Sequence, residues 1–146
     1  MQKLDFEITI AAPRARVWDT MIAPDTYRAW TSAFAEGSDF AGSWDEGAEI
    51  RFIGPNGDGM FAEIAENPLH EVISIRHLGM IENGVVDTTS EKVRAWAPAY
   101  ETYRFADDGA GGCRLSVSVD SVDEYAQYMR DTFPKALALL KGLCEK

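Results

Sequence analysis

The sequence predicts an α+β fold, in which a curved antiparallel sheet of about six to seven strands wraps a long C-terminal helix. Segments of alternating apolar and polar residues follow one another through turns rich in glycine and proline, without helical crossovers, and this arrangement is typical of antiparallel sheets. Two short helical segments follow the first of these strands. Residues 121–146 then repeat apolar side chains at helical spacing, and such a stripe needs a concave sheet to cover it.

The first predicted strand spans residues 3–11. Its apolar side chains alternate with polar ones, as in a half-buried strand, and they are Leu4, Phe6, Ile8 and Ile10. Pro13 follows the strand and suits the first turn of a helix over residues 13–22. A second short helix begins at Pro24 and carries Tyr27 on its apolar side.

The remaining predicted strands are short and are separated mainly by turns. In the longest of them, Ile73, Ile75 and His77 fall on one face. The glycine-rich residues 54–59 predict a hairpin loop, because several of them can adopt a positive φ. We expect strands over residues 38–44, 48–53, 60–66, 71–80, 100–106 and 113–119.

Residues 81–98 interrupt this series of strands. Thr88 and Glu91 have the spacing of a capping box, in which each side chain bonds the backbone N–H of the other residue, so we expect a short helix here. An insert on a tight sheet is either a mobile lid or a packing element. Trp96 favours packing, because one large apolar side chain can fix the segment to the sheet.

The C-terminal helix is predicted to begin at Ser121, which forms a second capping-box pattern with Glu124. Pro134 has no N–H to donate, and its ring crowds the carbonyl group of Arg130. Because the apolar stripe continues beyond this proline, we expect a bend in the helix and not its end. The stripe consists of Val122, Tyr125, Met129, Phe133, Ala136, Leu137, Leu140, Leu143 and Cys144.

Composition limits the class of function. The chain has 146 residues and a net charge of −10, from 24 acidic and 14 basic residues, so neither nucleic acid nor a membrane is expected as a partner. Asp5 and Glu7 argue against a signal peptide, and no apolar run approaches the roughly 20 residues of a membrane span. We therefore expect a cytoplasmic protein in which Cys113 and Cys144 are free thiols.

The phases of two predicted strands place three polar side chains on the inner face of the sheet. His77 shares the phase of Ile75, and Glu101 shares the phase of Tyr103, so these groups meet if the two strands are neighbours. A carboxylate beside a histidine raises the histidine pKa and can support general acid–base catalysis. The favoured interpretation is that the groups satisfy one another's hydrogen bonds within an apolar surrounding, and we assign no catalytic residue.

Aromatic and methionine side chains supply most candidates for a binding site. A concave site rich in aromatic residues suits a small apolar ligand, although each residue taken alone is equally consistent with core packing. Neither a metal nor an organic cofactor is predicted, because His70 and His77 are not at ligand spacing with cysteines and residues 54–59 lack the lysine of a phosphate-binding loop. The candidate ligand-binding residues are Trp30, Phe34, Trp44, Met60, His77, Glu101, Tyr103, Tyr125, Met129 and Phe133.

Three local patterns occur in a recognisable order. Residues 12–19 read A-P-x-x-x-V-W-D and are followed by P-D-x-Y-x-x-W at residues 24–30. Residues 42–47 read G-S-W-D-E-G, and residues 133–140 read F-P-K-A-L-x-x-L. With these patterns the whole chain resembles the SRPBCC superfamily of START and birch-pollen-allergen-like domains, and within it the family of the C-terminal domain of the activator of the Hsp90 ATPase.

This resemblance implies a single helix-grip domain over residues 1–146, with an apolar cavity between the sheet and the last helix. The superfamily includes lipid and polyketide binders, cyclases, transporters of small hydrophobic molecules and co-chaperones, so the fold leaves the function open. The leading hypothesis is binding of a small hydrophobic molecule. One alternative is a protein-interaction module for a chaperone, like the Hsp90 activator. The other is a cyclase- or hydrolase-type enzyme that acts on a polyketide-like ligand through His77 and Glu101.

Overall fold

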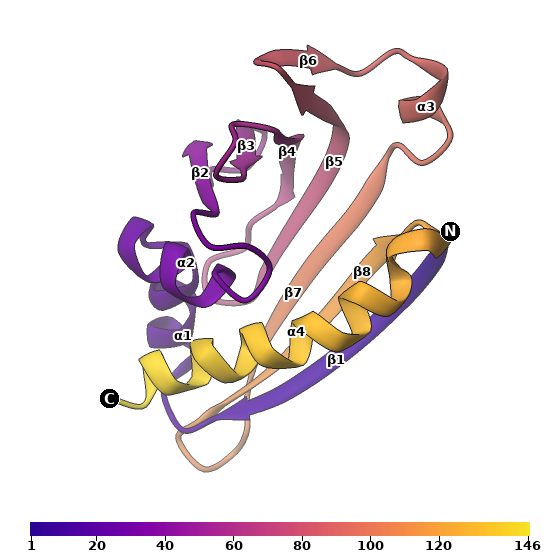
Figure 1. Ribbon diagram of the computed structural model, residues 1–146. Coiled ribbons are helices and arrows are strands. Elements are labelled where there is room, and N and C mark those ends of the chain that lie inside the picture. The colour runs from indigo at the N-terminus through magenta and orange to yellow at the C-terminus, as the bar shows by residue number, and fades with distance from the viewer.

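An eight-stranded antiparallel sheet forms the body of the protein (Figure 1). The computed structural model describes all residues from Met1 to Lys146. The strands lie in the order β1-β8-β7-β5-β4-β3-β2, with β6 paired to β5. Their bounds are β1 Gln2–Ile10, β2 Asp39–Gly42, β3 Glu49–Ile53, β4 Gly59–Glu66, β5 Val72–Glu82, β6 Val85–Asp87, β7 Ala99–Asp107 and β8 Cys113–Ser121.

The topology confirms the predicted helix-grip architecture. The first and last strands pair along their whole length, from Gln2 opposite Ser121 to Ile10 opposite Cys113. Strand β5 pairs with β7, so the two strands that flank the insert lie side by side. The eighth strand, β6, lies inside residues 81–98 and folds back on β5; it could not be recognised in the sequence, because a strand of three residues is too short to show alternation.

A β-bulge shifts the phase of β5 near its end. Residues 61 and 62 of β4 are adjacent, yet they lie opposite Gly79 and His77 of β5, which leaves Leu78 without a partner on β4. A bulge of this kind bends the strand and turns the side chains that follow it to the other face. Met80 therefore lies on the same concave side as His77, although the two residues are out of phase in a regular strand.

Two short helices follow β1, as predicted. Helix α1 spans Arg14–Ile22 and helix α2 spans Pro24–Thr31. Pro13 is the N-cap residue of α1, and Pro24 is the first residue of α2. The N–H groups at the start of a helix have no partner within the helix, so a proline there costs no hydrogen bond. Trp30 of α2 is buried, and its indole N–H donates to the carbonyl oxygen of Met21 at 3.0 Å. This bond ties the two helices together.

A short helix, α3, spans Glu91–Arg94 inside the insert, as expected, but its predicted cap is wrong. Ser90 is the N-cap residue, and its hydroxyl oxygen accepts from the backbone N–H of Val93 at 3.3 Å. Thr88 lies too early to cap the helix. The carboxylate of Asp87 accepts from the backbone N–H groups of the two residues before the helix, and this turn places Ser90 at the helix start.

Val93, and not Trp96, is the side chain that fixes the insert. Val93 is fully buried, whereas Trp96 is only half-buried. An exposed ion pair between Lys92 and Glu82, at 3.4 Å, also links α3 to β5. These contacts are consistent with the expectation that residues 81–98 pack on the sheet. The side chain that packs most deeply is Val93, and not the larger Trp96 that the sequence indicated.

The C-terminal helix, α4, spans Asp123–Cys144 and continues through Pro134, so the expectation that this proline does not end the helix is confirmed. The predicted capping box at its start is wrong. Ser121 is the last residue of β8, where it pairs with Gln2 and is buried. Its hydroxyl donates to the carbonyl oxygen of Val122, so it does not accept from the first N–H groups of the helix.

Helix α4 crosses the concave side of the sheet beside β1 (Figure 1), but only its C-terminal half is deeply packed. In the first half Ala126 is buried, yet Tyr125 is 57% exposed and Tyr128 is 45% exposed. From the middle of the helix onward the inward side chains are buried, namely Phe133, Ala136, Leu137, Leu140 and Cys144. The C-terminal half is therefore packed into the core, whereas the N-terminal half is held to the start of β1 mainly by polar contacts of Asp123 and Arg130.

The two cysteines are free and buried, as expected. Burial raises the pKa of both the Cys113 and the Cys144 thiol, which disfavours the reactive thiolate form. None of the helices combines the length and the apolar character that a membrane crossing needs.

The anchored half of α4 provides a test of the packing. Leu140 is fully buried and its neighbour Leu139 is 45% exposed. We expect Leu140→Ala to lower the free energy of unfolding by about 2–5 kcal/mol, because the truncation leaves a cavity under the helix. Leu139→Ala should change it by no more than about 0.5 kcal/mol. Urea denaturation of both variants measures the difference, and equal effects would contradict the assigned helix face.

Candidate ligand-binding site

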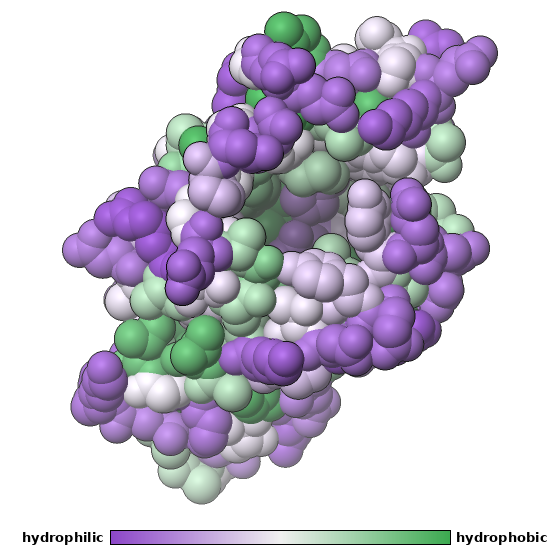
Figure 2. Space-filling view, viewed as in Figure 1, coloured by the Kyte–Doolittle hydropathy of each residue, from purple (hydrophilic) through white to green (hydrophobic).

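A pocket of about 580 Å³ lies between the concave side of the sheet and the N-terminal half of α4. Figure 2 shows the molecule hollowed on this face, above the helix. Of the 30 residues that line the pocket, 20 are hydrophobic, so the lining is mainly apolar. The pocket occupies the space that the poorly packed end of α4 leaves open.

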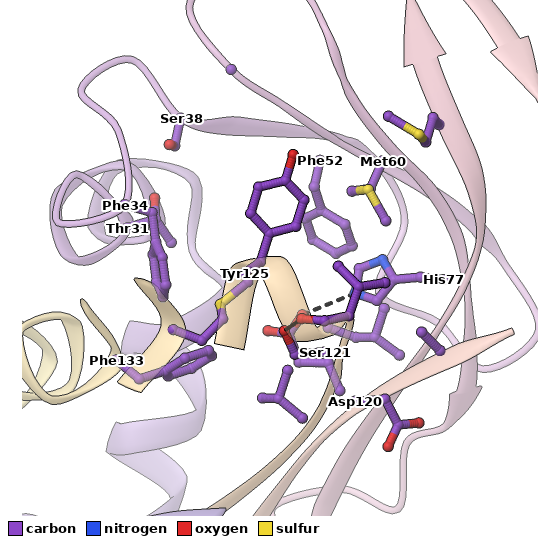
Figure 3. A pocket seen from close by; sticks show the side chains of 18 of the residues that line it. Thr31, Phe34, Ser38, Phe52, Met60, His77, Asp120, Ser121, Tyr125 and Phe133 are labelled. Atoms are coloured by element: carbon purple, nitrogen blue, oxygen red, sulfur yellow. Dashed lines mark hydrogen bonds and ion pairs between the residues drawn. The ribbon is translucent and has the colours of Figure 1, made fainter. Parts of the chain in front are cut away.

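The sheet, α2 and α4 supply most of its walls, and Lys92, Ala95 and Trp96 of the insert line it as well. The strands β3, β4 and β5 contribute Phe52, Met60, Ile75 and His77, and the helix α2 contributes Tyr27 and Trp30. The third wall is α4, with Tyr125, Met129 and Phe133. In Figure 3, Tyr125 stands between Phe34 on one side and Phe52 with Met60 on the other.

The structure places every candidate binding residue of the sequence analysis on this pocket. They are Trp30, Phe34, Trp44, Met60, His77, Glu101, Tyr103, Tyr125, Met129 and Phe133. The most deeply buried of them, Trp30, Tyr103 and Phe133, also belong to the main hydrophobic core. They therefore pack into the core and line the pocket at once, and that they bind a ligand remains a prediction.

An aromatic cluster centred on Tyr27 forms the wall near β2 and β3. The ring of Tyr27 lies 5.0 Å from Phe40, 5.7 Å from Trp30 and 6.1 Å from Trp44, measured between ring centroids. Trp44 in turn lies 5.7 Å from Phe52. Most of these rings meet edge to face or tilted, the arrangement that aromatic pairs prefer. The cluster gives the pocket one rigid side.

Methionine forms a large share of the remaining lining. The chain has five methionines, Met1, Met21, Met60, Met80 and Met129, and all of them line the pocket. The methionine side chain is flexible and polarisable, so it adapts to ligands of irregular shape. The pocket thus combines a rigid aromatic side with adaptable thioether groups.

A buried polar group lies in the part of the wall formed by β5 and β7. Ile75 of β5 lies opposite Glu101 of β7, so His77, two residues further along β5, is a diagonal neighbour of Glu101. The predicted contact between His77 and Glu101 is observed. The Nε2 atom of His77 lies 2.9 Å from one carboxylate oxygen of Glu101 (dashed line in Figure 3). The hydroxyl of Tyr103 donates to the other carboxylate oxygen.

These bonds determine the charge of Glu101. Burial alone raises the pKa of this carboxyl group, but the interactions with His77 and the hydrogen bond from Tyr103 outweigh it, so the pKa lies below its ordinary value. Burial, together with the charge of Glu101, raises the pKa values of the Tyr103 and Tyr27 hydroxyls. At neutral pH Glu101 is therefore a carboxylate, and the phenols of Tyr103 and Tyr27 are neutral.

Two buried polar atoms of the wall have no hydrogen-bond partner, Nε1 of Trp44 and Nδ1 of His77. Since Glu101 accepts from Nε2, the hydrogen-bond pattern assigns the proton of a neutral imidazole to Nε2 and leaves a lone pair on Nδ1. Both unpartnered atoms are shielded from solvent. His77 thus has no free nitrogen exposed to the pocket, and the geometry gives little support to direct proton exchange with a ligand.

The opening of the pocket lies beside the exposed end of α4. The hydroxyl of Tyr128 donates to the carbonyl oxygen of Phe34, which links the helix to the loop after α2. Tyr125 stands at the opening, and its ring is the most exposed aromatic side chain of the lining. No three histidine, cysteine, aspartate or glutamate side chains gather in a set that could hold a metal ion.

The sequence missed several lining residues for identifiable reasons. Tyr27 shares a helix face with Trp30 and could have been added from that spacing. Phe52 lies on the same face of β3 as Ile50 and could have been added from that alternation. No pattern in the sequence indicated Met80, because the bulge in β5 turns its side chain to the opposite face from the one that alternation predicts.

No family model matches the sequence, and no curated protein matches it either. Solved structures do share its fold. The protein MLL2253 from Mesorhizobium loti has a TM-score of 0.74 at 12% identity, over 97% of this chain and 96% of that one. DynU16, a protein of the dynemicin biosynthetic locus, has a TM-score of 0.71 at 13% identity and covers all of this chain, which spans only 48% of DynU16.

A third similar structure is the Aha1 dimer from Colwellia psychrerythraea. Its TM-score is 0.67 at 14% identity, over 98% of this chain and 93% of that one. Likenesses at such low identity establish the helix-grip fold alone and leave the function open.

The charge of Glu101 can be tested through stability. Because its pKa is lower in the folded chain than in the unfolded one, the ionised form stabilises the fold above the unfolded pKa of about 4.3, and this stabilisation is lost as the pH falls through the folded pKa. We expect Glu101→Gln to cost about 1–3 kcal/mol at pH 7, and less as the pH approaches about 3.

Urea denaturation of the wild type and the variant between pH 7 and pH 3 measures this difference. Glu66→Gln is the matched control, since Glu66 is exposed and forms no ion pair; it should cost no more than about 0.5 kcal/mol at any pH. A cost of Glu101→Gln that does not change with pH would contradict an ionised, paired carboxylate.

Proposed function

We propose that this protein binds a small hydrophobic molecule in the pocket between the sheet and α4. The observation that carries the proposal is an apolar pocket of about 580 Å³ with a few polar groups on its wall, because sites for drug-sized ligands are concave, mainly apolar and about 300–1,000 Å³ in size. In this proposal residues 1–146 act as one SRPBCC-like domain of the cytoplasm, and the binding residues are those of the sequence analysis.

The composition of the lining supports the same function. Aromatic rings on one side and methionine on the others offer contact area for a ligand whose shape need not be tightly defined. Tyr125 is largely exposed at the opening. A ligand that covered its ring would bury apolar surface, at about 25 cal/mol per Å² of area removed from water.

Uptake of a neutral apolar dye tests the proposal. We expect Nile red to bind the wild type with saturable fluorescence enhancement, and Met129→Trp to weaken this binding at least tenfold, because the larger ring occupies the pocket beside Phe133. Leu139→Trp places the same ring on the exposed face of the same helix and should bind as the wild type does. Thermal denaturation confirms that both variants are folded.

Two results would overturn the proposal. One is the absence of saturable dye binding to the wild type. The other is equal binding by the wild type and a folded Met129→Trp variant, which would place the dye outside the pocket.

A second candidate function is a protein-interaction module that regulates Hsp90. The Aha1 dimer of C. psychrerythraea shares the fold over 98% of this chain, and the motif resemblance points to the same family. If ligand binding is the function, the purified protein should leave the ATPase rate of Hsp90 unchanged at equimolar and tenfold excess. Stimulation of that rate, with retention in an Hsp90 pull-down, would favour the second candidate.

An enzymatic role has the weakest support. The pair of His77 and Glu101 predicted for general acid–base catalysis does form. However, Nε2 of His77 is occupied by the carboxylate, and Nδ1 is buried in the wall without a partner. The two side chains therefore hydrogen-bond each other, and neither nitrogen of His77 is placed to exchange a proton with a ligand.

A further inference from the structure

The charges around the pocket are unevenly distributed. Carboxylates line it at Asp39, Glu101, Asp120 and Glu124. Asp39 pairs with Arg28 at 3.4 Å and Asp120 with Lys3 at 4.0 Å, which leaves Glu101 and Glu124 without a Lys or Arg partner. The cationic groups among its lining residues are the side chain of Lys92 and the N-terminal amine of Met1. Each of these already faces an acid outside the pocket wall, Glu82 at 3.4 Å and Asp123 at 3.6 Å respectively. No free cation is thus present to receive an anionic ligand.

Glu101 is the carboxylate set deepest in the wall. Its side chain retains 22% of its surface, and it lines the pocket, so this exposed part faces the space a ligand would occupy. A carboxylate offers about four lone-pair positions, and two hydrogen bonds, from His77 and Tyr103, are present. Glu101 therefore has acceptor capacity left for a ligand.

The groups bonded to Glu101 do not cancel its charge. The Tyr103 hydroxyl is a neutral donor. A protonated imidazole at His77 would bury a second N–H at Nδ1, where no acceptor is present, and an unsatisfied buried donor is costly. With a neutral imidazole, which donates through Nε2 alone and avoids this cost, the wall carries a net negative charge at this point.

Aromatic rings surround the same point. The ring centroid of His77 lies 5.8 Å from that of Phe52. Phe52 in turn contacts Trp44, and Trp44 contacts Tyr27. The faces of aromatic rings carry negative electrostatic potential and attract cations, most strongly where water is excluded. Carboxylate and rings therefore favour the same ligand charge, and both oppose an anionic one.

We propose that the hydrophobic ligand carries a protonated amine, for which Glu101 is the counter-ion beside the aromatic cluster. This inference rests on the proposed function and adds the chemical class of the ligand: hydrophobic amines are bound, and hydrophobic carboxylates such as fatty acids are rejected. The ammonium group donates to the free lone pairs of Glu101, while its apolar body lies against Met60, Met129 and Ile75.

Three fluorescent probes with one hydrocarbon body test this proposal, 1-pyrenemethylamine, 1-pyrenemethanol and 1-pyrenecarboxylate. At pH 7 the first is a cation, the second is neutral and the third is an anion. Titration of each probe with the full chain, followed by the change in pyrene emission, gives its Kd. We expect the amine to bind the wild type at least tenfold more tightly than the carboxylate, with the alcohol between them.

Two variants and a salt series locate the origin of this preference. The net charge of −10 attracts any cation, but salt screens such long-range attraction, so a preference that arises in the pocket persists at 0.5 M sodium chloride. Glu101→Gln should reduce the ratio of the two Kd values at least fivefold. Glu66→Gln, which removes the same charge from an exposed site, should leave the ratio unchanged.

The outcomes separate the two proposals. If none of the three probes binds, the proposed function fails. If the alcohol binds but the carboxylate binds as tightly as the amine, the ligand class is wrong and the pocket function stands. A preference for the amine that vanishes in salt, or that folded Glu101→Gln retains in full, would also overturn the role of Glu101.

Discussion

The structure depends on the contact of Phe133 with the sheet. This ring is 2% exposed, stacks on Phe6 of β1 at 4.9 Å and meets the edge of Phe34 at the same distance. Beyond it, Leu137 and Leu140 continue a close-packed interface. Before it, the helix turns largely exposed side chains toward the opening. Phe133 therefore marks the boundary between a filled core and an open pocket.

The polar and apolar parts of the pocket depend on each other. A carboxylate in an apolar wall is costly unless it is hydrogen-bonded. Glu101 meets this condition because the register of β5 and β7 places His77 beside it, and strand alternation places Tyr103 on the same face of β7. The same bonds keep the carboxylate ionised, so Glu101 provides a fixed charge in a mainly hydrophobic part of the wall. The amine selectivity that we infer follows from this combination of charge, aromatic rings and absence of a free cation.

Strand alternation is sufficient to predict which side chains share the inner face, and it places His77, Glu101 and Tyr103 together. It fails at Met80, because a bulge is not visible in an apolar pattern. The capping signals at Ser121 and Thr88 fail because tertiary pairing outweighs a local motif: β8 holds Ser121 in the sheet, and Asp87 sets the turn before α3. The pocket itself cannot be deduced from the sequence, since Tyr125 and Met129 would suit a filled core equally well.

The most direct test of the account is methyl NMR of the protein labelled at its methionine and isoleucine δ1 methyl groups, with Ile10 as the reference signal. All five methionines line the pocket, whereas Ile10 is buried in the core away from it. On titration with 1-pyrenemethanol we expect saturable shifts of the Met60, Met80 and Met129 signals, through the ring current of the bound probe, and a constant Ile10 signal. Methionine signals that stay unchanged at saturating probe would show that the space between the sheet and α4 does not admit a ligand.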